Sequence, residues 1–227
     1  MARDTKSLLK SVFPAARPLQ RWMRSVGLSP RKQNLQKIFS DIYVNNAWAN
    51  DESVSGGGST LARTEAIRKE LPDLLQSLGA KSLLDAACGD FNWMRQVNLS
   101  GIEYLGVDIV SGLIAANQRM YAGAATSFVT LDITGAELPK ADVILCRDCL
   151  IHLSFDHGLQ AINNFRRSGS TFLLATTHSS ITENLDIGSG AWRNINLQLP
   201  PYSLPQPLKT IVEDSWIGKD LSLWRLN

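Results

Sequence analysis

The sequence predicts a doubly wound α/β fold, with a mostly parallel seven-stranded sheet, a C-terminal antiparallel hairpin and N-terminal cap helices. Three observations lead to this prediction. Short apolar runs alternate with amphipathic or polar segments from about residue 56 onward, the pattern of parallel strands covered by helices on both faces. The last two runs lie too close together for a crossover helix, so they are expected to pair antiparallel. The 227 residues, 44% hydrophobic and 19% charged, suffice for one buried core.

The residues before the sheet predict two cap helices. Apolar side chains recur at near-helical spacing over residues 8–26, where Pro14 and Pro18 interrupt a single long helix. After a turn at residues 27–30 comes an amphipathic stripe, which consists of Leu35, Ile38, Phe39, Ile42 and Tyr43. We therefore divide the chain into a basic helical arm or cap, residues 1–54, and a main domain, residues 55–227.

The main domain is predicted to hold seven strands and three helices. The apolar runs that predict strands are residues 82–87, 104–110, 126–131, 142–146, 171–176, 208–213 and 221–226. Helices are expected over residues 61–77, 111–121 and 155–167. The first of them should be capped by Ser59 or Thr60 and interrupted at Pro72. Residues 179–207, rich in Asn, Gly and Pro, predict a long loop on the substrate side of the domain.

Acidic residues end the first three predicted strands. Asp85 belongs to the first strand and is followed by a turn containing Gly89, whereas Asp108 and Asp132 end the second and third. Ligands of doubly wound sheets bind outside these strand ends, where Asp108 can accept both hydroxyls of a ribose. Asp132 can receive the exocyclic amine of adenine. Because the glycine-rich phosphate-binding motifs are absent, the pattern favours a nucleoside without phosphates.

At these residues the chain resembles the class I S-adenosylmethionine-dependent methyltransferases, over about residues 61–227. The resemblance implies S-adenosylmethionine as the cofactor and places Trp48, Ser59 and Thr60 near its methionine tail. The family's glycine-rich turn keeps only its acid and middle glycine here, with Ala87 and Phe91 at the outer positions. Phe91 could cover the cofactor. The cofactor residues expected from the resemblance are Trp48, Thr60, Asp85, Ala87, Gly89, Asp108, Ile109, Asp132, Ile133 and Arg147.

The segment after the fourth strand is the candidate catalytic segment, because in this family it faces the methyl group. Asp148 and His152 are four residues apart, so one helical turn would place both on one face. His152 has a suitable intrinsic pKa for a base at neutral pH, and Asp148 could orient it or act alone. Nucleobase methyltransferases usually carry an Asn/Asp-Pro-Pro-aromatic run here, and its absence counts against base methylation and a nucleic-acid partner.

Polar and aromatic residues of the 179–207 region suggest the acceptor site. His178, Trp192 and Arg193 are our candidate substrate-binding residues, since amides, an Arg and an aromatic face suit polar metabolites and carbohydrates. These residues could instead satisfy their own backbone. A zinc set built from the three cysteines and His152 is disfavoured by its short C-x-x-C-x-x-H spacing, so we predict no metal.

The sequence therefore predicts O-methylation of a glycan, a lipid-linked sugar or a small polar metabolite. N-methylation of an amine or amino acid remains an alternative, and so does a non-catalytic module that only binds the cofactor. Three cysteines and no long apolar run predict a cytoplasmic protein. Residues 1–40 carry nine Lys and Arg side chains against one acid, Asp4. This arm could contact an anionic membrane, placing the protein at the inner membrane face, or could only cap the fold.

Overall fold

The computed structural model describes residues 34–226, and the residues from Leu35 onward form one compact unit. The first predicted cap helix and most of the basic arm lie outside the described residues. The second cap helix is present as α2, Leu35–Val44. Residues 35–54 therefore belong to the same unit as the sheet, whereas we expected the main domain to begin at residue 55.

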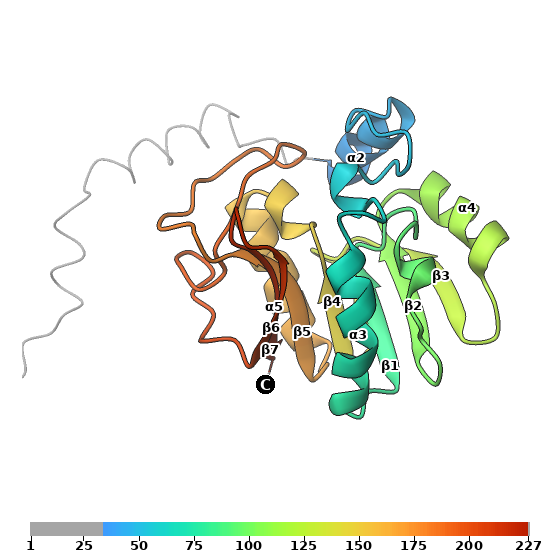
Figure 1. Cartoon of the computed structure of the whole chain (residues 1–227). Helices are drawn as coiled ribbons and strands as arrows, with labels where there is room; N and C mark the ends of the chain where they lie inside the picture. The colour runs from blue at the N-terminus through green and yellow to red at the C-terminus, as the bar shows by residue number, and fades with distance from the viewer. Residues whose placement is uncertain (1–33, 227) are drawn as a thin grey trace, which may run out of the picture. The chain divides into compact units, whose positions relative to one another are not determined.

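The sheet has seven strands in the order β3-β2-β1-β4-β5-β7-β6 (Figure 1). Strands β1 to β5 are parallel, and β7 runs antiparallel to both β5 and β6. This confirms the predicted parallel sheet with a C-terminal hairpin. The strands are β1 Ser82–Ala86, β2 Glu103–Asp108, β3 Thr126–Thr130, β4 Val143–Cys146, β5 Phe172–His178, β6 Lys209–Asp214 and β7 Lys219–Arg225.

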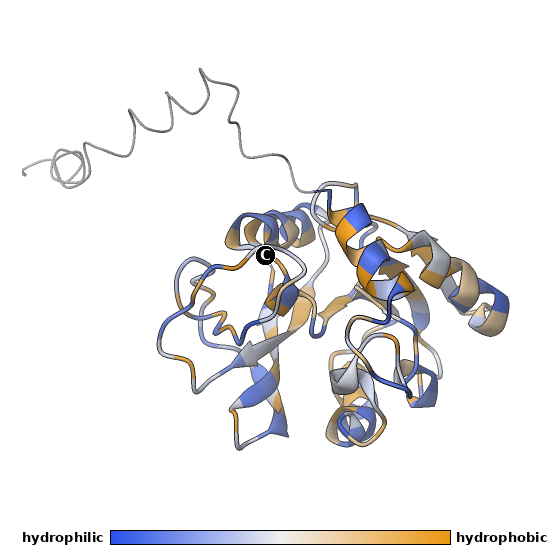
Figure 2. Cartoon of the chain, turned by 90° about the horizontal axis from the view of Figure 1, so that it is seen from above, coloured by the Kyte–Doolittle hydropathy of each residue, from blue (hydrophilic) through white to orange (hydrophobic). Residues whose placement is uncertain are grey.

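Helices cover both faces of the sheet, as the view from above shows (Figure 2). On one face, α3 (Glu65–Ser77) and α4 (Ser111–Tyr121) pack in a core that includes Leu83. On the other face, α5 (Phe155–Arg167) packs in a core that includes Leu84. Successive residues of a strand point to opposite faces, so the buried apolar residues of the strands contribute to both cores. Within residues 34–226, the structure contains no helix with the length and apolar composition needed to cross a membrane.

The start of α3 differs from the prediction. The helix begins at Glu65, with Thr64 at its N-cap and no side-chain capping bond. The Thr60 hydroxyl donates a hydrogen bond to the Gly57 carbonyl (3.0 Å), so Thr60 closes the preceding turn instead. Pro72 lies inside α3, which continues through it to Ser77, so the proline does not end the helix. Three short 3-10 turns, Gly57–Ser59, Met94–Gln96 and Leu150–His152, complete the described elements.

Candidate functional site

A cleft opens at the carboxyl edge of the parallel strands, beneath α2 and the segment that follows it. Together with the open solvent space at its mouth, it measures about 1050 Å³. The structure brings together here nearly all the residues expected to bind the cofactor or act in catalysis. The predicted residues that line the cleft are Trp48, Asp85, Ala87, Gly89, Asp108, Ile109, Asp132, Ile133, Arg147, Asp148 and His152.

Asp108, at the end of β2, faces the turn that follows β1. One carboxylate oxygen accepts the Gly89 N–H (3.2 Å) and the other accepts the Val110 N–H (3.0 Å). Burial raises the pKa of Asp108 from its ordinary 3.8 to about 6. A carboxylate has about four acceptor positions, so each oxygen keeps capacity for a further hydrogen bond from a hydroxyl in the cleft.

Asp85 and Asp132 supply the other two strand-end carboxyl groups of the cleft. The Tyr104 hydroxyl donates to Asp85 (2.7 Å), and burial raises the pKa of Asp85 from 3.8 to about 7. Asp132 Oδ1 accepts both the N–H (2.8 Å) and the hydroxyl (2.7 Å) of Thr134. These bonds fix the Asp132 carboxylate at the end of β3 and leave lone pairs for an amine. Each acid thus holds a different position along one cleft.

A loop before the first strand is pinned over the glycine turn by Asp90. The Ser53 hydroxyl donates to Asp90 Oδ2 (2.8 Å), and so does the Val54 N–H (3.0 Å). The Asp90 N–H in turn donates to the Ser55 hydroxyl (2.9 Å). A Cβ on Gly89 would collide with that hydroxyl. The close approach of the Ser55 side chain therefore favours glycine at this position, where φ is also positive (+55°).

Gly89→Ala should weaken cofactor binding about tenfold or more, because the new methyl group must push the Ser55 loop away from the cleft. The matched control is Gly101→Ala, which also has a positive φ (+78°) but open space around its Cβ. Both variants should lose about 1 kcal/mol of stability through backbone strain. Thermal unfolding and calorimetric titration with the cofactor separate the two effects. Equal cofactor affinity in both variants would contradict this role of Gly89.

Phe91 does not cover the cleft, contrary to the expectation. It has a positive φ (61°) and its ring is buried. The ring packs against Tyr104, Tyr121 and Phe128, with centroid separations of 5.1, 5.3 and 5.1 Å. The residue that replaces the last glycine of the family turn thus extends the core beneath α4. It leaves the cleft open to a ligand.

Asp148 belongs to a buried ion network and does not hydrogen-bond His152. Its carboxylate contacts Lys219 Nζ (2.7 Å) and Arg147 Nη1 (3.2 Å). Both cations also pair with Glu213, at 3.1 Å and 2.7 Å. Burial opposes ionisation of Asp148, yet Arg147 and Lys219 outweigh it and lower the pKa of Asp148 to about 2. A carboxylate held this way is a poor base, and its oxygens are committed to the network.

His152 instead takes its orientation from the long loop and from Trp48. Its Nδ1 lies 2.9 Å from the Ala191 carbonyl oxygen, and the Trp48 ring stacks on it at 4.8 Å. A carbonyl can only accept, so Nδ1 carries the proton and Nε2 keeps its lone pair. Burial lowers the pKa of His152 below 6.5 despite the favourable bond to Ala191. His152 is therefore a neutral imidazole at the wall of the cleft, with one nitrogen able to accept a proton.

The predicted substrate-binding residues do not line the cleft. His178 is buried at the end of β5 and pairs with the backbone of Ile195. The Arg193 guanidinium is also buried, where it donates to the Leu153 carbonyl (2.7 Å) and the Tyr202 hydroxyl (3.1 Å). Trp192 is 61% exposed. His178 and Arg193 thus bond nearby backbone and side-chain groups of the protein rather than facing the cleft.

Other cleft-lining residues were missed from the sequence. Of the two neighbouring residues expected near the methionine tail, Ser59 lines the cleft, whereas Thr60 bonds within its own turn. The sequence identifies α2 as an amphipathic helix, but which part of the fold its apolar face covers depends on tertiary packing. The additional lining residues include Phe39, Ile42, Tyr43, Ser55, Trp93, Cys149 and Leu153. Among residues 34–226, no cluster of His, Cys, Asp and Glu side chains is arranged to hold a metal ion.

No protein-family model and no curated protein matches the chain, but solved structures do. Magnesium protoporphyrin IX methyltransferase (ChlM) from Synechocystis PCC 6803, with bound SAM, has a TM-score of 0.58 and 12% identity, covering 87% of this chain and 99% of that one. The 1,6-didemethyltoxoflavin-N1-methyltransferase of Burkholderia thailandensis, with bound S-adenosylhomocysteine, has a TM-score of 0.58 and 17% identity, covering 84% and 86%. The chain therefore has the class I S-adenosylmethionine-dependent methyltransferase fold.

Proposed function

We propose that the chain is an S-adenosylmethionine-dependent O-methyltransferase that acts on a hydroxyl carried by an apolar or aromatic molecule. The observation that supports this most is the convergence of the three strand-end carboxyl groups on one cleft beside a neutral His152. Their chemistry matches the groups of the cofactor: Asp108 suits two ribose hydroxyls, and Asp132 suits the adenine amine. Gly89 lines the cleft and lets the Ser55 side chain pack directly against the turn that follows β1.

In this proposal some residues of the cleft bind the cofactor, and His152 accepts a proton. When bound, the cofactor supplies a methyl group on a positively charged sulfur, already activated for displacement. Asp85, near the methionine end by the family resemblance, offers a negative charge to that cation. His152 Nε2 accepts the proton of the acceptor hydroxyl, which makes the oxygen a better nucleophile. Trp48 and the Ala191 carbonyl hold the imidazole in place.

The lining of the cleft supports an acceptor with an apolar body. Phe39, Ile42 and Tyr43 of α2 face the cleft together with Trp48 and Leu153. The carbohydrate acceptor expected from the sequence depended on polar groups of the long loop. Several of those groups are occupied: Asn184 Nδ2, for example, donates to the carbonyls of Asn196 and Pro200 (2.8 and 2.9 Å). An aromatic or aliphatic hydroxyl compound fits the remaining surface better than a sugar does.

Incubation with methyl-labelled cofactor tests this function. The acceptor panel should contain phenols, long-chain alcohols, sugars and amines of similar size, with the His152→Ala variant as the enzyme control. Label in the phenols or alcohols is the expected result. Label confined to sugars would restore the carbohydrate acceptor, and label in amines would replace O-methylation by N-methylation. Tight cofactor binding with no transfer to any compound of the panel would leave only a binding module.

Binding of S-adenosylmethionine at pH 6 should release a substantial fraction of one proton. Asp85 has a pKa raised to about 7 by burial, so it is largely protonated at pH 6 in the empty cleft. A cation beside it lowers that pKa and expels the proton. Affinity should therefore rise with pH between about 5 and 7 and then level off.

Calorimetric titration in two buffers of different ionisation enthalpy measures this release. S-adenosylhomocysteine is the matched ligand, because it lacks the charge on sulfur and should release fewer protons. In Asp85→Asn the difference between the two ligands should vanish. Equal proton release by both ligands in the unmodified protein would contradict the placement of Asp85 beside the cationic sulfur.

A further inference from the structure

The turn that carries His152 is bonded along its length to one short segment of the long loop. The Gly190 N–H donates to the His152 carbonyl (2.8 Å), and the Arg193 N–H donates to the Ile151 carbonyl (3.2 Å). Arg193 Nη1 donates to the next carbonyl, that of Leu153 (2.7 Å). Three consecutive carbonyls of the turn therefore accept hydrogen bonds from two residues of the loop.

The same segment of the loop sets the position of the His152 ring. The Ala191 carbonyl oxygen lies 2.9 Å from Nδ1 of the ring. Ala191 lies between Gly190 and Arg193, whose hydrogen bonds hold the backbone of the turn. A shift of the loop against the turn would separate Nδ1 from its carbonyl acceptor, and the imidazole could then take either neutral tautomer.

The Arg193 side chain extends this contact to two further parts of the fold. Its Nη2 donates to the Tyr202 hydroxyl (3.1 Å), and its guanidinium lies over the Phe155 ring, 4.9 Å from the centroid. Phe155 is the first residue of α5, which follows the turn. One side chain therefore joins the end of the turn, the start of the next helix and a later part of the loop.

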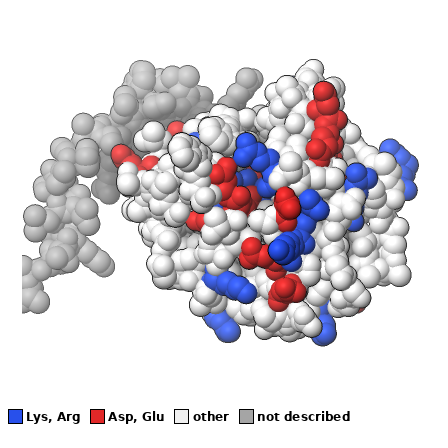
Figure 3. Space-filling view, in the orientation of Figure 1, with Lys and Arg blue, Asp and Glu red and all other residues white. Residues whose placement is uncertain are grey.

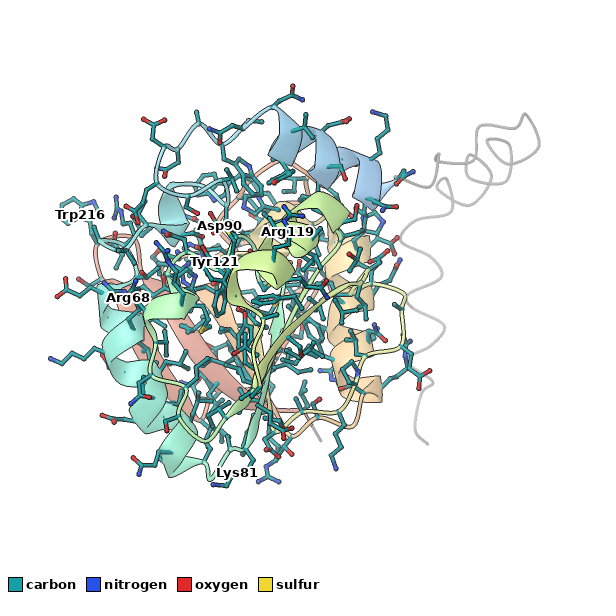
Figure 4. All side chains as sticks on the ribbon, turned by 90° about the vertical axis from the view of Figure 1, so that its right-hand side faces the viewer. Arg68, Lys81, Asp90, Arg119, Tyr121 and Trp216 are labelled. Atoms are coloured by element: carbon teal, nitrogen blue, oxygen red, sulfur yellow. The ribbon has the colours of Figure 1, made fainter. Side chains whose placement is uncertain are left out.

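Arg193 is a buried cation without a carboxylate partner. It is 7% exposed, and among residues 34–226 no acidic side chain forms an ion pair with it and its Nε has no hydrogen-bond partner. On the face shown in Figure 3, by contrast, acidic and basic side chains are interspersed, and Lys81 is exposed at the periphery of the molecule (Figure 4). Burial of an unpaired cation costs free energy that a methionine of similar length would avoid. Packing alone therefore does not account for an arginine here.

We infer that Arg193 is a positioning residue for His152: its guanidinium fixes the long loop against the turn, so that the Ala191 carbonyl keeps the proton on Nδ1 and the lone pair on Nε2. Arg193 does not line the cleft, so it acts through the imidazole and not on a ligand. The use of Nε2 as a base rests on the proposed function, whereas the tautomer of His152 does not.

The tautomer of His152 tests this positioning without cofactor or acceptor. The chain has three histidines, so long-range proton–nitrogen NMR spectra of the full chain can resolve each imidazole, and His152→Ala assigns its signals. The unmodified chain should show the Nδ1–H tautomer. Arg193→Met keeps the length of the side chain without its donors or charge, and should show a mixture of both neutral tautomers. Arg193→Lys, which keeps the charge and a donor for the Leu153 carbonyl, should restore the Nδ1–H tautomer.

Methyl transfer tests the consequence for the reaction. In Arg193→Met, kcat with a hydroxyl acceptor should fall about 10- to 100-fold, the result of a small misplacement of a catalytic group, while cofactor affinity stays within about threefold. His152→Ala and the double variant should have equal rates, because Arg193 acts only through the imidazole. Arg225→Met is the matched control. The Arg225 guanidinium also lies over a phenylalanine ring, that of Phe172 (5.3 Å), but at the opposite edge of the sheet, so neither the tautomer nor kcat should change.

The inference is overturned if Arg193→Met keeps the Nδ1–H tautomer, or if it slows the reaction as much in the His152→Ala background as in the unmodified chain. Absence of the Nδ1–H tautomer from the unmodified chain would overturn it too. If Arg193→Met does not fold, Tyr202→Phe is used instead, since it removes only the second partner of the guanidinium. An unchanged tautomer in Tyr202→Phe would then contradict the inference. Full activity of His152→Ala would instead refute the proposed base, so the two proposals can fail separately.

Discussion

Replacement of His152 by alanine is expected to slow methyl transfer to a hydroxyl acceptor by about 10²–10⁴-fold, the usual contribution of a positioned general base. Cofactor affinity should stay within about threefold, because the three strand-end acids are unchanged. The expected loss of rate follows from the geometry of His152. The Ala191 carbonyl fixes one proton on Nδ1, so Nε2 is the atom that can accept the proton of the substrate hydroxyl. Initial rates with saturating cofactor, together with calorimetric binding, measure both quantities.

The pH profile gives an independent check on the same residue. Burial lowers the pKa of His152 below 6.5, so the imidazole is neutral at physiological pH and becomes protonated only in acid. The rate should therefore fall with decreasing pH below 6.5, and this limb should be absent in His152→Ala. His157→Ala is the matched histidine control, since His157 contacts Ser154 and Ser189 and does not line the cleft. Full activity of His152→Ala at every pH would rule out His152 as the base.

Replacement of Asp108 by alanine is expected to weaken binding of S-adenosylmethionine by about 2–3 kcal/mol, roughly 30- to 150-fold. Hydrogen bonds to a charged acceptor are worth about 1.5–3 kcal/mol each, and the variant loses those to the ribose. It also removes the acceptor for the Gly89 and Val110 N–H groups, which shape the turn. Calorimetry gives the affinity, and circular dichroism verifies that the variant remains folded.

A double-mutant cycle separates the ribose contact from the effect on the turn. The unmodified protein should bind S-adenosylhomocysteine more tightly than its 2′,3′-dideoxy analogue, whereas Asp108→Ala should scarcely distinguish the two ligands. A change confined to the shape of the turn would weaken both ligands equally and leave their ratio intact. In that outcome Asp108 would be a structural residue of the turn, and the ribose assignment would be wrong.

The cofactor half of the cleft could be predicted from sequence because its residues follow from topology. Three strands that are adjacent and parallel bring their ends to one edge, so Asp85, Asp108 and Asp132 had to meet. The acceptor half could not be predicted this way. Whether Arg193 faces a ligand or the Tyr202 hydroxyl depends on how the long loop packs, and no local pattern encodes that.

Asp148 is a single residue whose surroundings likewise could not be predicted from the sequence. Its spacing from His152 suggested a helical pair, but residues 150–152 form a 3-10 turn and Asp148 has a positive φ (51°). Its shortest ion-pair contact, to Lys219, is with a residue 71 positions away in the chain.

The amphipathic stripe of α2 was likewise visible in the sequence. Its use as a wall of the cleft was not, because amphipathicity identifies an apolar face without identifying what it contacts.

The ion network has a consequence for how the cleft is assembled during folding. Arg147 donates to the Gly58 carbonyl (2.8 Å) and to Glu213, while Lys219 reaches Asp148. These contacts join a loop before the first strand, the end of β4 and both strands of the last hairpin. Contacts between such distant segments form late, because the intervening chain must first be ordered. The part of the cleft held by this ion network needs all of these segments, so it becomes complete only when the hairpin docks beside β5.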